Sequence, residues 1–139
     1  MKKEFINWKK EWETGIKKID EQHKHFVGII NQVDVLNEDG KEKDKLEPII
    51  NDLMEYVRVH FSTEEGYFDD TDYPDTDEHK EKHQELLGKV INFGNRFKNE
   101  EDVSQVVKEL LIFLKDWLDE HLIEYDHKYV PWLTEHGIK

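Results

Sequence analysis

The sequence predicts an all-α protein, an antiparallel up-down-up-down four-helix bundle with an N-terminal arm and a short C-terminal tail. Three observations lead to this fold class. Four stretches of the 139-residue chain carry apolar residues at spacings of three and four, the period of an amphipathic helix. Breaks rich in Gly, Pro, Asp and Asn separate these stretches. No stretch of useful length alternates apolar and polar residues, so we expect almost no sheet.

The first helix is predicted from about Ile19 to Leu36, and the break Asn37-Glu38-Asp39-Gly40 ends it. The second is predicted from about Asp44 to Phe68. Because proline lacks a backbone N–H, we expect Pro48 in the first turn of this helix. An acidic break from Asp69 to Pro74 follows.

The third helix is predicted from about Thr76 to Phe97. The fourth is predicted from about Val103 to Lys128, and Pro131 limits its end. Short connections between four helices of this length favour antiparallel neighbours.

We assign residues 1–139 to a single domain, since this length fits one domain. Within it we expect an aromatic-rich arm at 1–18, the bundle at 19–128 and a tail at 129–139. The tail carries Trp132 and Leu133, through which we expect it to dock on the bundle.

Composition excludes several classes of function. The chain has no Cys, which excludes disulfides, thiolate metal sites and cysteine nucleophiles. Its 33 acidic and 20 basic residues give a net charge of −13, which argues against binding to nucleic acid or to anionic membranes and favours a monomer. No signal peptide or apolar stretch of about 20 residues is present. We therefore expect a cytoplasmic protein.

Five histidines occupy positions where the apolar stripes of the predicted helices call for Leu or Ile, and every helix contributes at least one: His23, His60, His79, His83 and His121. One buried histidine is usually hydrogen-bonded to a neighbour. Five in an otherwise plain bundle would be costly, because each buried imidazole needs partners. A shared metal site would satisfy all five. The other three, His25, His127 and His136, fall outside the stripes, and we expect them at the surface.

The spacing supports a metal site. His79 and His83 are four residues apart, so they project from one helix face. His60 and Glu64 repeat this spacing with a carboxylate, whereas we expect the adjacent Glu65 to be solvated. Five imidazoles and one or two carboxylates exceed the donors that one ion binds. They indicate two metals joined by bridging carboxylates, and six-coordinate iron fits this donor set better than four-coordinate zinc.

Four ordered segments of the chain resemble the hemerythrin family in its bacterial single-domain form. They are Trp8 with GIKKIDEQH ending at His23, HFSTE from His60 to Glu64, YPDTDEHKEKH ending at His83, and HLIEYD from His121 to Asp126.

The resemblance implies two iron ions (Fe2+/Fe3+) joined by a hydroxo or oxo group. It assigns seven ligands: His79, His83 and His121 on one iron, His23 and His60 on the other, and Glu64 and Asp126 bridging both. Asp126 is the least expected of these by spacing, since five residues in an ideal helix turn it about 140° away from His121. Helical phase alone would favour Glu124 or Tyr125, so we expect local deformation or an oblique reach.

The resemblance implies reversible O2 binding at the iron with two histidines. The protein would then be an oxygen carrier, store or supplier to an oxygen-consuming enzyme, and not itself an enzyme. Alternatives are a di-iron redox enzyme acting on peroxide or nitric oxide, or an O2-sensing module. Reversible binding requires a dry pocket. We expect its lining to come from five residues: Phe61, Trp117, Leu118, Leu122 and Trp8.

Overall fold

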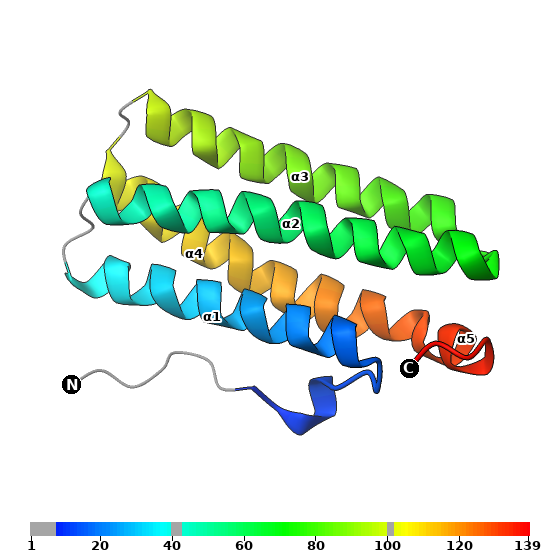
Figure 1. Ribbon diagram of the computed structural model, residues 1–139. Coiled ribbons are helices and arrows are strands. Elements are labelled where there is room, and N and C mark those ends of the chain that lie inside the picture. The colour runs from blue at the N-terminus through cyan, green and yellow to red at the C-terminus, as the bar shows by residue number, and fades with distance from the viewer. Residues whose placement is uncertain (1–7, 40–42, 100–101) are drawn as a thin grey trace.

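A computed structural model of the protein describes residues 8–39, 43–99 and 102–139. For residues 38–39, 43–44 and 122–126 it describes only the backbone. The long helices are α1 (Lys17–Asp39), α2 (Lys43–Thr71), α3 (Thr76–Lys98) and α4 (Val103–Trp117). They lie side by side and alternate in direction (Figure 1). The described residues contain no strand. The predicted all-α, up-down-up-down four-helix bundle is confirmed.

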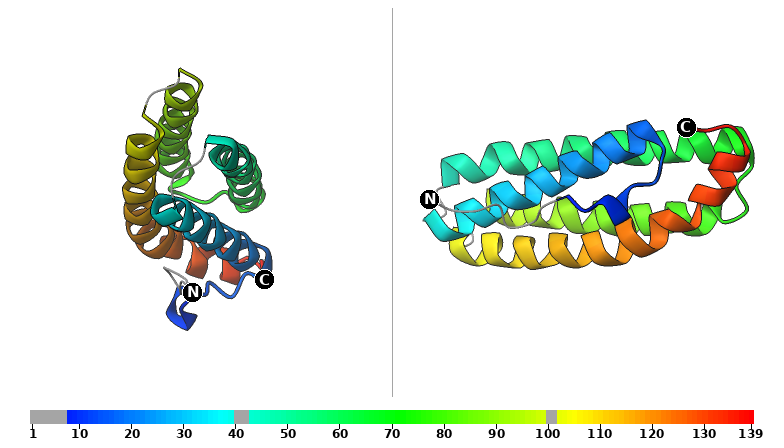
Figure 2. Two further views of the ribbon diagram at one scale, coloured as in Figure 1. Left: turned by 90° about the vertical axis from the view of Figure 1, so that its left-hand side faces the viewer. Right: turned by 90° about the horizontal axis from the view of Figure 1, so that it is seen from below.

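Each long helix packs against two others. α1 contacts α2 and α4, and α3 contacts the same two helices from the opposite side. Seen along its axis, the bundle therefore has a helix at each of four corners (Figure 2). No helix of the described residues has the length and apolar content that crossing a membrane requires.

The fourth helix does not continue in one form to Lys128 as predicted. Beyond Trp117 the chain winds into a π-helix, η2 (Leu118–Tyr125), and then into one 3-10 turn, η3 (Asp126–Lys128). A short helix, α5 (Val130–Glu135), follows and lies across the end of the bundle (Figure 1). Pro131 lies in the first turn of α5, where the missing N–H costs little.

Pro48 lies just past the first turn of α2, in which it was predicted. It is the sixth residue of α2, past the first turn, so its missing N–H removes one helical hydrogen bond.

A side chain of α1 holds the segment before it. That segment contains one 3-10 turn, η1 (Lys10–Trp12), and then Gly15 at φ +83°, a left-handed conformation that favours glycine. The carboxylate of Asp20 accepts hydrogen bonds from the Thr14 amide (2.8 Å), the Thr14 hydroxyl (2.9 Å) and the Gly15 amide (3.2 Å). These bonds fix the angle at which the chain enters α1.

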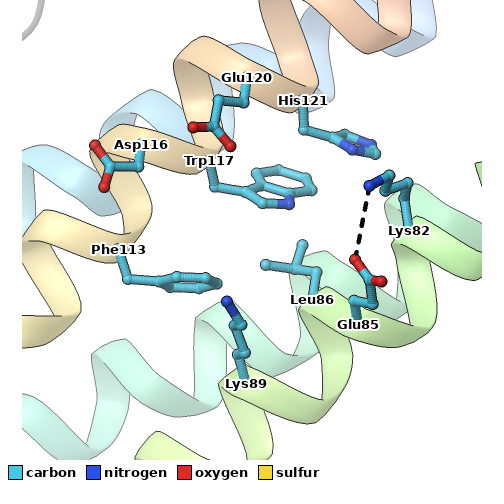
Figure 3. Close-up of a pocket in the computed structure, with 9 residues that line it drawn as sticks. All are labelled: Lys82, Glu85, Leu86, Lys89, Phe113, Asp116, Trp117, Glu120 and His121. Atoms are coloured by element: carbon cyan, nitrogen blue, oxygen red, sulfur yellow. Dashed lines mark ion pairs between the residues drawn. The ribbon is translucent and has the colours of Figure 1, made fainter.

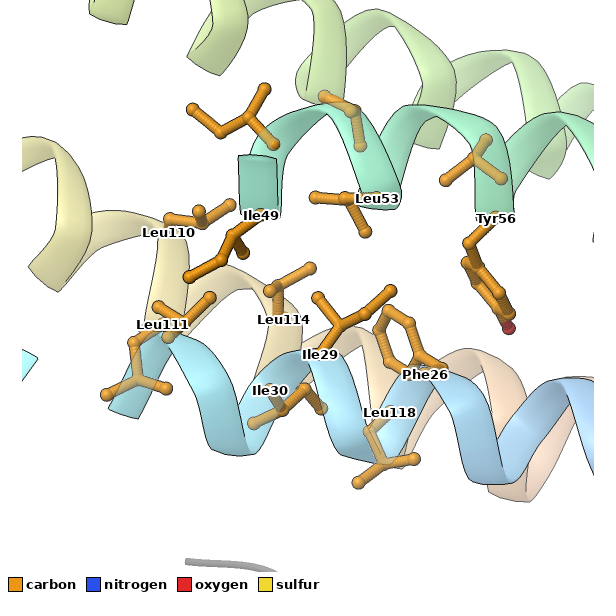
Figure 4. Packing of buried hydrophobic residues seen from close by; sticks show 14 of the residues in the cluster. Phe26, Ile29, Ile30, Ile49, Leu53, Tyr56, Leu110, Leu111, Leu114 and Leu118 are labelled. Atoms are coloured by element: carbon orange, nitrogen blue, oxygen red, sulfur yellow. The ribbon is translucent and has the colours of Figure 1, made fainter. Parts of the chain in front are cut away.

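The core has two parts. The main hydrophobic cluster runs along the bundle axis, where Ile30, Leu53 and Leu114 are among its fully buried members (Figure 4). A second cluster lies at the end of the bundle that carries α5 and is built from six buried residues: Ile16, Ile19, Phe68, Tyr73, Tyr129 and Leu133. Trp132 packs against this second cluster and donates a hydrogen bond from Nε1 to Thr71 Oγ1 at 3.0 Å.

Candidate metal centre

Six buried ionisable side chains meet inside the bundle, and none is more than 4% exposed. All four sides of the bundle contribute a helical segment to this set: His23 lies in α1, His60 and Glu64 in α2, His79 and His83 in α3, and His121 in η2, the continuation of α4. The structure thus brings together every predicted ligand whose side chain it describes.

The six side chains form two groups of possible metal ligands. The first group is Glu64, His79, His83 and His121, and the second is His23, His60 and Glu64. Within each group the donor atoms lie within 4.8 Å of one another. Glu64 belongs to both groups, so its carboxylate lies between two potential metal positions.

Distances around Glu64 show how closely the imidazoles converge on it. Its Oε1 lies 2.9 Å from His83 Nε2 and 3.4 Å from the Nε2 atoms of both His60 and His79. A carboxylate without solvent exposure is stable only with partners of this kind. The i, i+4 spacing of His60 and Glu64 places both on the inner face of α2, as predicted.

The Nδ1 atom of His60 faces a glutamine. It lies 2.7 Å from Oε1 of Gln22, the residue before His23, and Gln22 Nε2 in turn donates to Thr63 Oγ1 at 3.0 Å. Sequence reasoning missed this residue. Its position next to a ligand was the only signal available, since Gln22 itself lies outside the apolar stripe.

The Nδ1 atom of His83 faces a carboxylate. Glu65 Oε2 lies 2.8 Å from it, and the Glu65 side chain is 30% exposed. The expectation that Glu65 is a solvated charge is wrong. Residues 64 and 65 point to different sides of α2, yet α3 lies close enough for His83 to contact both carboxylates.

Aromatic rings cover the imidazoles. Phe61 stacks on His83 with ring centroids 3.7 Å apart, and Trp117 stacks on His121 at 4.4 Å. Tyr56 stacks on His60 at 5.4 Å, and Phe68 meets His79 edge-on at 4.9 Å. The sequence-based pocket list included Phe61 and Trp117 but not Tyr56 or Phe68. These rings surround the ligands with apolar surface.

The other predicted pocket residues lie in different settings. Leu118 is 3% exposed and belongs to the main core cluster. Trp8 is partly buried against that cluster and meets Trp12 edge-on at 5.6 Å. The side chain of Leu122 lies outside the described residues.

A groove of about 670 Å³ reaches one ligand from the surface. It lies between α3 and the α4–η2 segment, with Leu86, Phe113 and Trp117 inside it and His121 at one end (Figure 3). Charged side chains line it as well, including Lys82 and Glu85, whose charged atoms lie 3.9 Å apart. The groove therefore reaches the centre at His121, on which Trp117 stacks.

The structure does not describe the side chain of Asp126. The backbone of η2, which leads to this residue, nevertheless bears on its predicted role as a ligand. Hydrogen bonds in a π-helix join residues five apart, whereas those in an α-helix join residues four apart. Residues separated by five positions are therefore on successive turns of η2, which contains His121 and ends at Tyr125. The backbone departs from α-helical winding at the place where the spacing of five led us to expect deformation.

The remaining histidines are only partly where we expected them. His25 is exposed, with its Nε2 3.1 Å from Asp52 Oδ1, and the exposed His136 stacks on Trp132. His127 is half-buried, contrary to expectation, because its Nε2 lies 3.2 Å from the carbonyl oxygen of Trp12.

The donor set fits an iron pair. Five buried imidazoles and a shared carboxylate are nitrogen and oxygen donors of the kind that first-row transition metals prefer. The fold and this centre together define a class: four-helix-bundle proteins with an imidazole-rich cluster in the core that could hold metal ions.

The particular family follows from comparison with known proteins. The family model described as "Hemerythrin HHE cation binding domain" matches residues 14–133. The chain belongs to the hemerythrin family, which confirms the resemblance drawn from its four segments.

Individual relatives agree with this assignment. The chain is 37% identical over 126 residues to a bacteriohemerythrin of Clostridium acetobutylicum, covering 88% of this chain and 97% of that protein. It is 34% identical to a bacteriohemerythrin of Pseudomonas aeruginosa (strain LESB58), covering 88% and 78%. A crystal structure of wild-type hemerythrin superposes with a TM-score of 0.81 at 26% identity, covering 94% of this chain and 98% of that one.

Proposed function

We propose that this protein binds O2 reversibly at a non-haem di-iron centre. The observation that carries the proposal is the position of Glu64, a fully buried carboxylate that belongs to two groups of imidazole ligands at once. A single metal would need only one such group. Membership of the hemerythrin family supports iron as the metal and O2 as the ligand.

The ligand assignment follows the two groups. His79, His83 and His121 would hold one iron, and His23 and His60 the other. Glu64 would bridge them, together with Asp126 and a hydroxo or oxo group. The position with two histidines has fewer protein donors, so we place the O2 site there. When bound, an iron pair would supply the electrons for reversible O2 binding.

The protein's own part in this function is to orient donors and to exclude water. The aromatic rings of Phe61, Trp117 and Tyr56 lie flat on three of the imidazoles, which fixes their planes. Apolar cover also limits water and protons near the centre, both of which favour irreversible oxidation. We extend this lining to Leu118, Leu122 and Trp8.

In the cell we propose a carrier, store or supplier of oxygen to an oxygen-consuming enzyme. The strongly negative charge of the chain supports a monomer that does not bind nucleic acid, and we propose that it acts in the cytoplasm. The imidazole-rich donor set supports binding rather than catalysis, because the di-iron enzymes of ferritin-like bundles use carboxylate-rich sites with two Glu-x-x-His motifs.

The test is a visible absorption spectrum of the protein loaded with Fe2+ under anaerobic conditions. We expect a charge-transfer colour that develops with O2 and disappears when O2 is removed, over repeated cycles. A colour that decays once to a stable diferric state would favour redox turnover on peroxide or nitric oxide. Two bound irons with no response to O2 would overturn the proposal. The Glu64→Ala variant serves as the control and should not bind two irons.

A further inference from the structure

Two histidines of the centre contact different chemical groups through Nδ1, the ring nitrogen that does not face Glu64. His60 Nδ1 faces the amide oxygen of Gln22 at 2.7 Å, and His83 Nδ1 faces the carboxylate of Glu65 at 2.8 Å. Each contact also joins two helices, α1 to α2 for Gln22 and α2 to α3 for Glu65. The two metal positions therefore have unlike supports, one neutral and one negatively charged.

The amide of Gln22 has a fixed orientation. The Thr63 hydroxyl donates to the carbonyl oxygen of Val59 at 2.9 Å, so its lone pairs are available to accept from Gln22 Nε2 at 3.0 Å. This leaves the Gln22 oxygen to accept from Nδ1–H of His60. The chain of bonds keeps the proton of His60 on Nδ1 and directs Nε2 toward Glu64.

Glu65 supports His83 more strongly. An ionised carboxylate only accepts hydrogen bonds, so His83 donates from Nδ1, and its Nε2 lies 2.9 Å from Glu64 Oε1 on the other side. Hydrogen bonds to a charged acceptor are roughly twice as strong as neutral ones. A carboxylate behind a ligating imidazole raises the basicity of that ligand.

We propose that Glu65 and Gln22 are positioning residues that make the two metal positions unequal, and this inference rests on the proposed di-iron function. The carboxylate behind His83 favours tight binding and the more highly charged metal ion at the position with three histidines. The neutral amide behind His60 leaves the position with two histidines weaker. The chain would then load its metals in order, with the three-histidine position first.

The two supports can be exchanged with little change in shape. Glu65→Gln replaces the carboxylate by an amide, and Gln22→Glu replaces the amide by a carboxylate. Each variant keeps an oxygen acceptor for the imidazole N–H. The readouts are anaerobic Co2+ titration of the metal-free protein, followed by its d–d absorption, and the midpoint potential of the iron-loaded protein.

We expect Glu65→Gln to weaken the first Co2+ site about 10- to 100-fold and to raise the midpoint potential. Gln22→Glu should tighten the second Co2+ site and lower the potential. Opposite shifts from these two changes would not arise if the residues merely joined helices, because a structural role gives loss of stability in both variants.

Matched controls separate local from general effects of charge. Glu81→Gln removes one negative charge from the exposed face of α3, between His79 and His83, and should leave both readouts near wild type. Thr63→Val removes the bond that orients Gln22 and should weaken the second Co2+ site alone, whereas Thr63→Ser keeps the hydroxyl and should restore it. These Thr63 variants test the inference even if a charge exchange prevents folding.

The outcomes distinguish the inference from the function on which it rests. Failure of the wild-type protein to bind two metals would overturn both. Two bound Co2+ ions with wild-type affinities and potentials in Glu65→Gln, Gln22→Glu and Thr63→Val would overturn this inference alone and leave reversible O2 binding in place.

Discussion

Glu64 and Glu65 show how much one position along a helix matters. The first carboxylate is fully buried among imidazoles, and the second lies at the edge of the centre behind one of them. Helical phase identified Glu64 from the sequence, because it continues the stripe that contains His60. The role of Glu65 could not be predicted in this way, since it depends on the distance between α2 and α3.

Leu118 provides a test of the pocket at the level of one side chain. Leu118→Ala should leave a cavity beside Trp117, admit water and shorten the lifetime of the O2-dependent colour. A buried leucine truncated to alanine also costs about 2–5 kcal/mol of unfolding free energy. The measurement is the decay of the colour in air, with chemical denaturation alongside.

Leu46→Ala is the matched control for Leu118→Ala. Leu46 is equally buried but lies near the start of α2, about 20 Å along the helix from His60. It should lose similar stability and keep the colour lifetime of the wild type. Equal lifetimes in the two variants would remove Leu118 from the proposed pocket.

At the scale of elements, η2 is the feature that the sequence could not provide. Apolar periodicity predicted the first three helices nearly to their ends and the start of the fourth, because burial of one face fixes their phase. Periodicity assumes α-helical winding, however, and it favoured Glu124 or Tyr125 over Asp126. The π-helical winding of residues 118–125 changes which spacing returns to the same face.

This winding leads to a paired prediction. Asp126→Asn should reduce iron binding from two ions per chain to one or none, because a bridging carboxylate is lost, whereas Glu124→Gln should keep both ions. Iron is counted by metal analysis after anaerobic loading and desalting. The reverse result would place the second carboxylate at Glu124, as helical phase alone suggests.

An ion pair at the surface joins helices α3 and α4. The two terminal guanidinium nitrogens of Arg96 donate to the Glu109 carboxylate at 3.0 Å each, and Gln105 Nε2 donates a third hydrogen bond at 2.8 Å. The Arg96 hydrogen bonds, then that of Gln105, lower the pKa of Glu109 below its usual 4.5. Any stability from this contact is present above the unfolded-state pKa and is lost as pH falls through the lower folded-state value.

We expect NMR titration to find the pKa of the Glu109 carboxyl lowered in the folded protein, and to find a smaller lowering in Arg96→Gln, where the hydrogen bond from Gln105 remains. Because the group is exposed, the effect on stability should be small. A titration unchanged by Arg96→Gln would show that the bidentate contact does not persist in solution.

At the scale of the whole molecule, the fold class and the convergence of six predicted ligands inside the bundle could be predicted from the sequence. The aromatic side chains that enclose this centre were harder to predict. Buried histidines interrupt apolar stripes, which makes them visible in a sequence. The residues that cover them, such as Tyr56 and Phe68, look like ordinary core aromatics. Their contact with ligands depends on how the helices pack, which no single stripe encodes.

Metal binding should stabilise the entire bundle, since its ligands come from all four sides. An ion present at 100 times its dissociation constant adds about 2.7 kcal/mol to folding. For a chain of this size, this corresponds to a rise in Tm of about 10 °C. Calorimetry of iron-loaded and chelator-treated protein measures the difference. Glu64→Ala loses the carboxylate shared by both ligand groups, so iron should raise its Tm by less than it raises that of the wild type.

The contact between the first and last segments of the chain has a consequence for the order of folding. His127 meets the carbonyl of Trp12 across 115 positions of sequence, and Ile16 shares a buried cluster with Leu133. Contacts between such distant positions carry a large loop-closure entropy, so we expect them to form late. The cluster that Ile16 and Leu133 share lies at the end of the bundle where Figure 1 shows α5. A nascent chain would then keep this end open until the rest has assembled, which gives metal ions a route inward before the final closure.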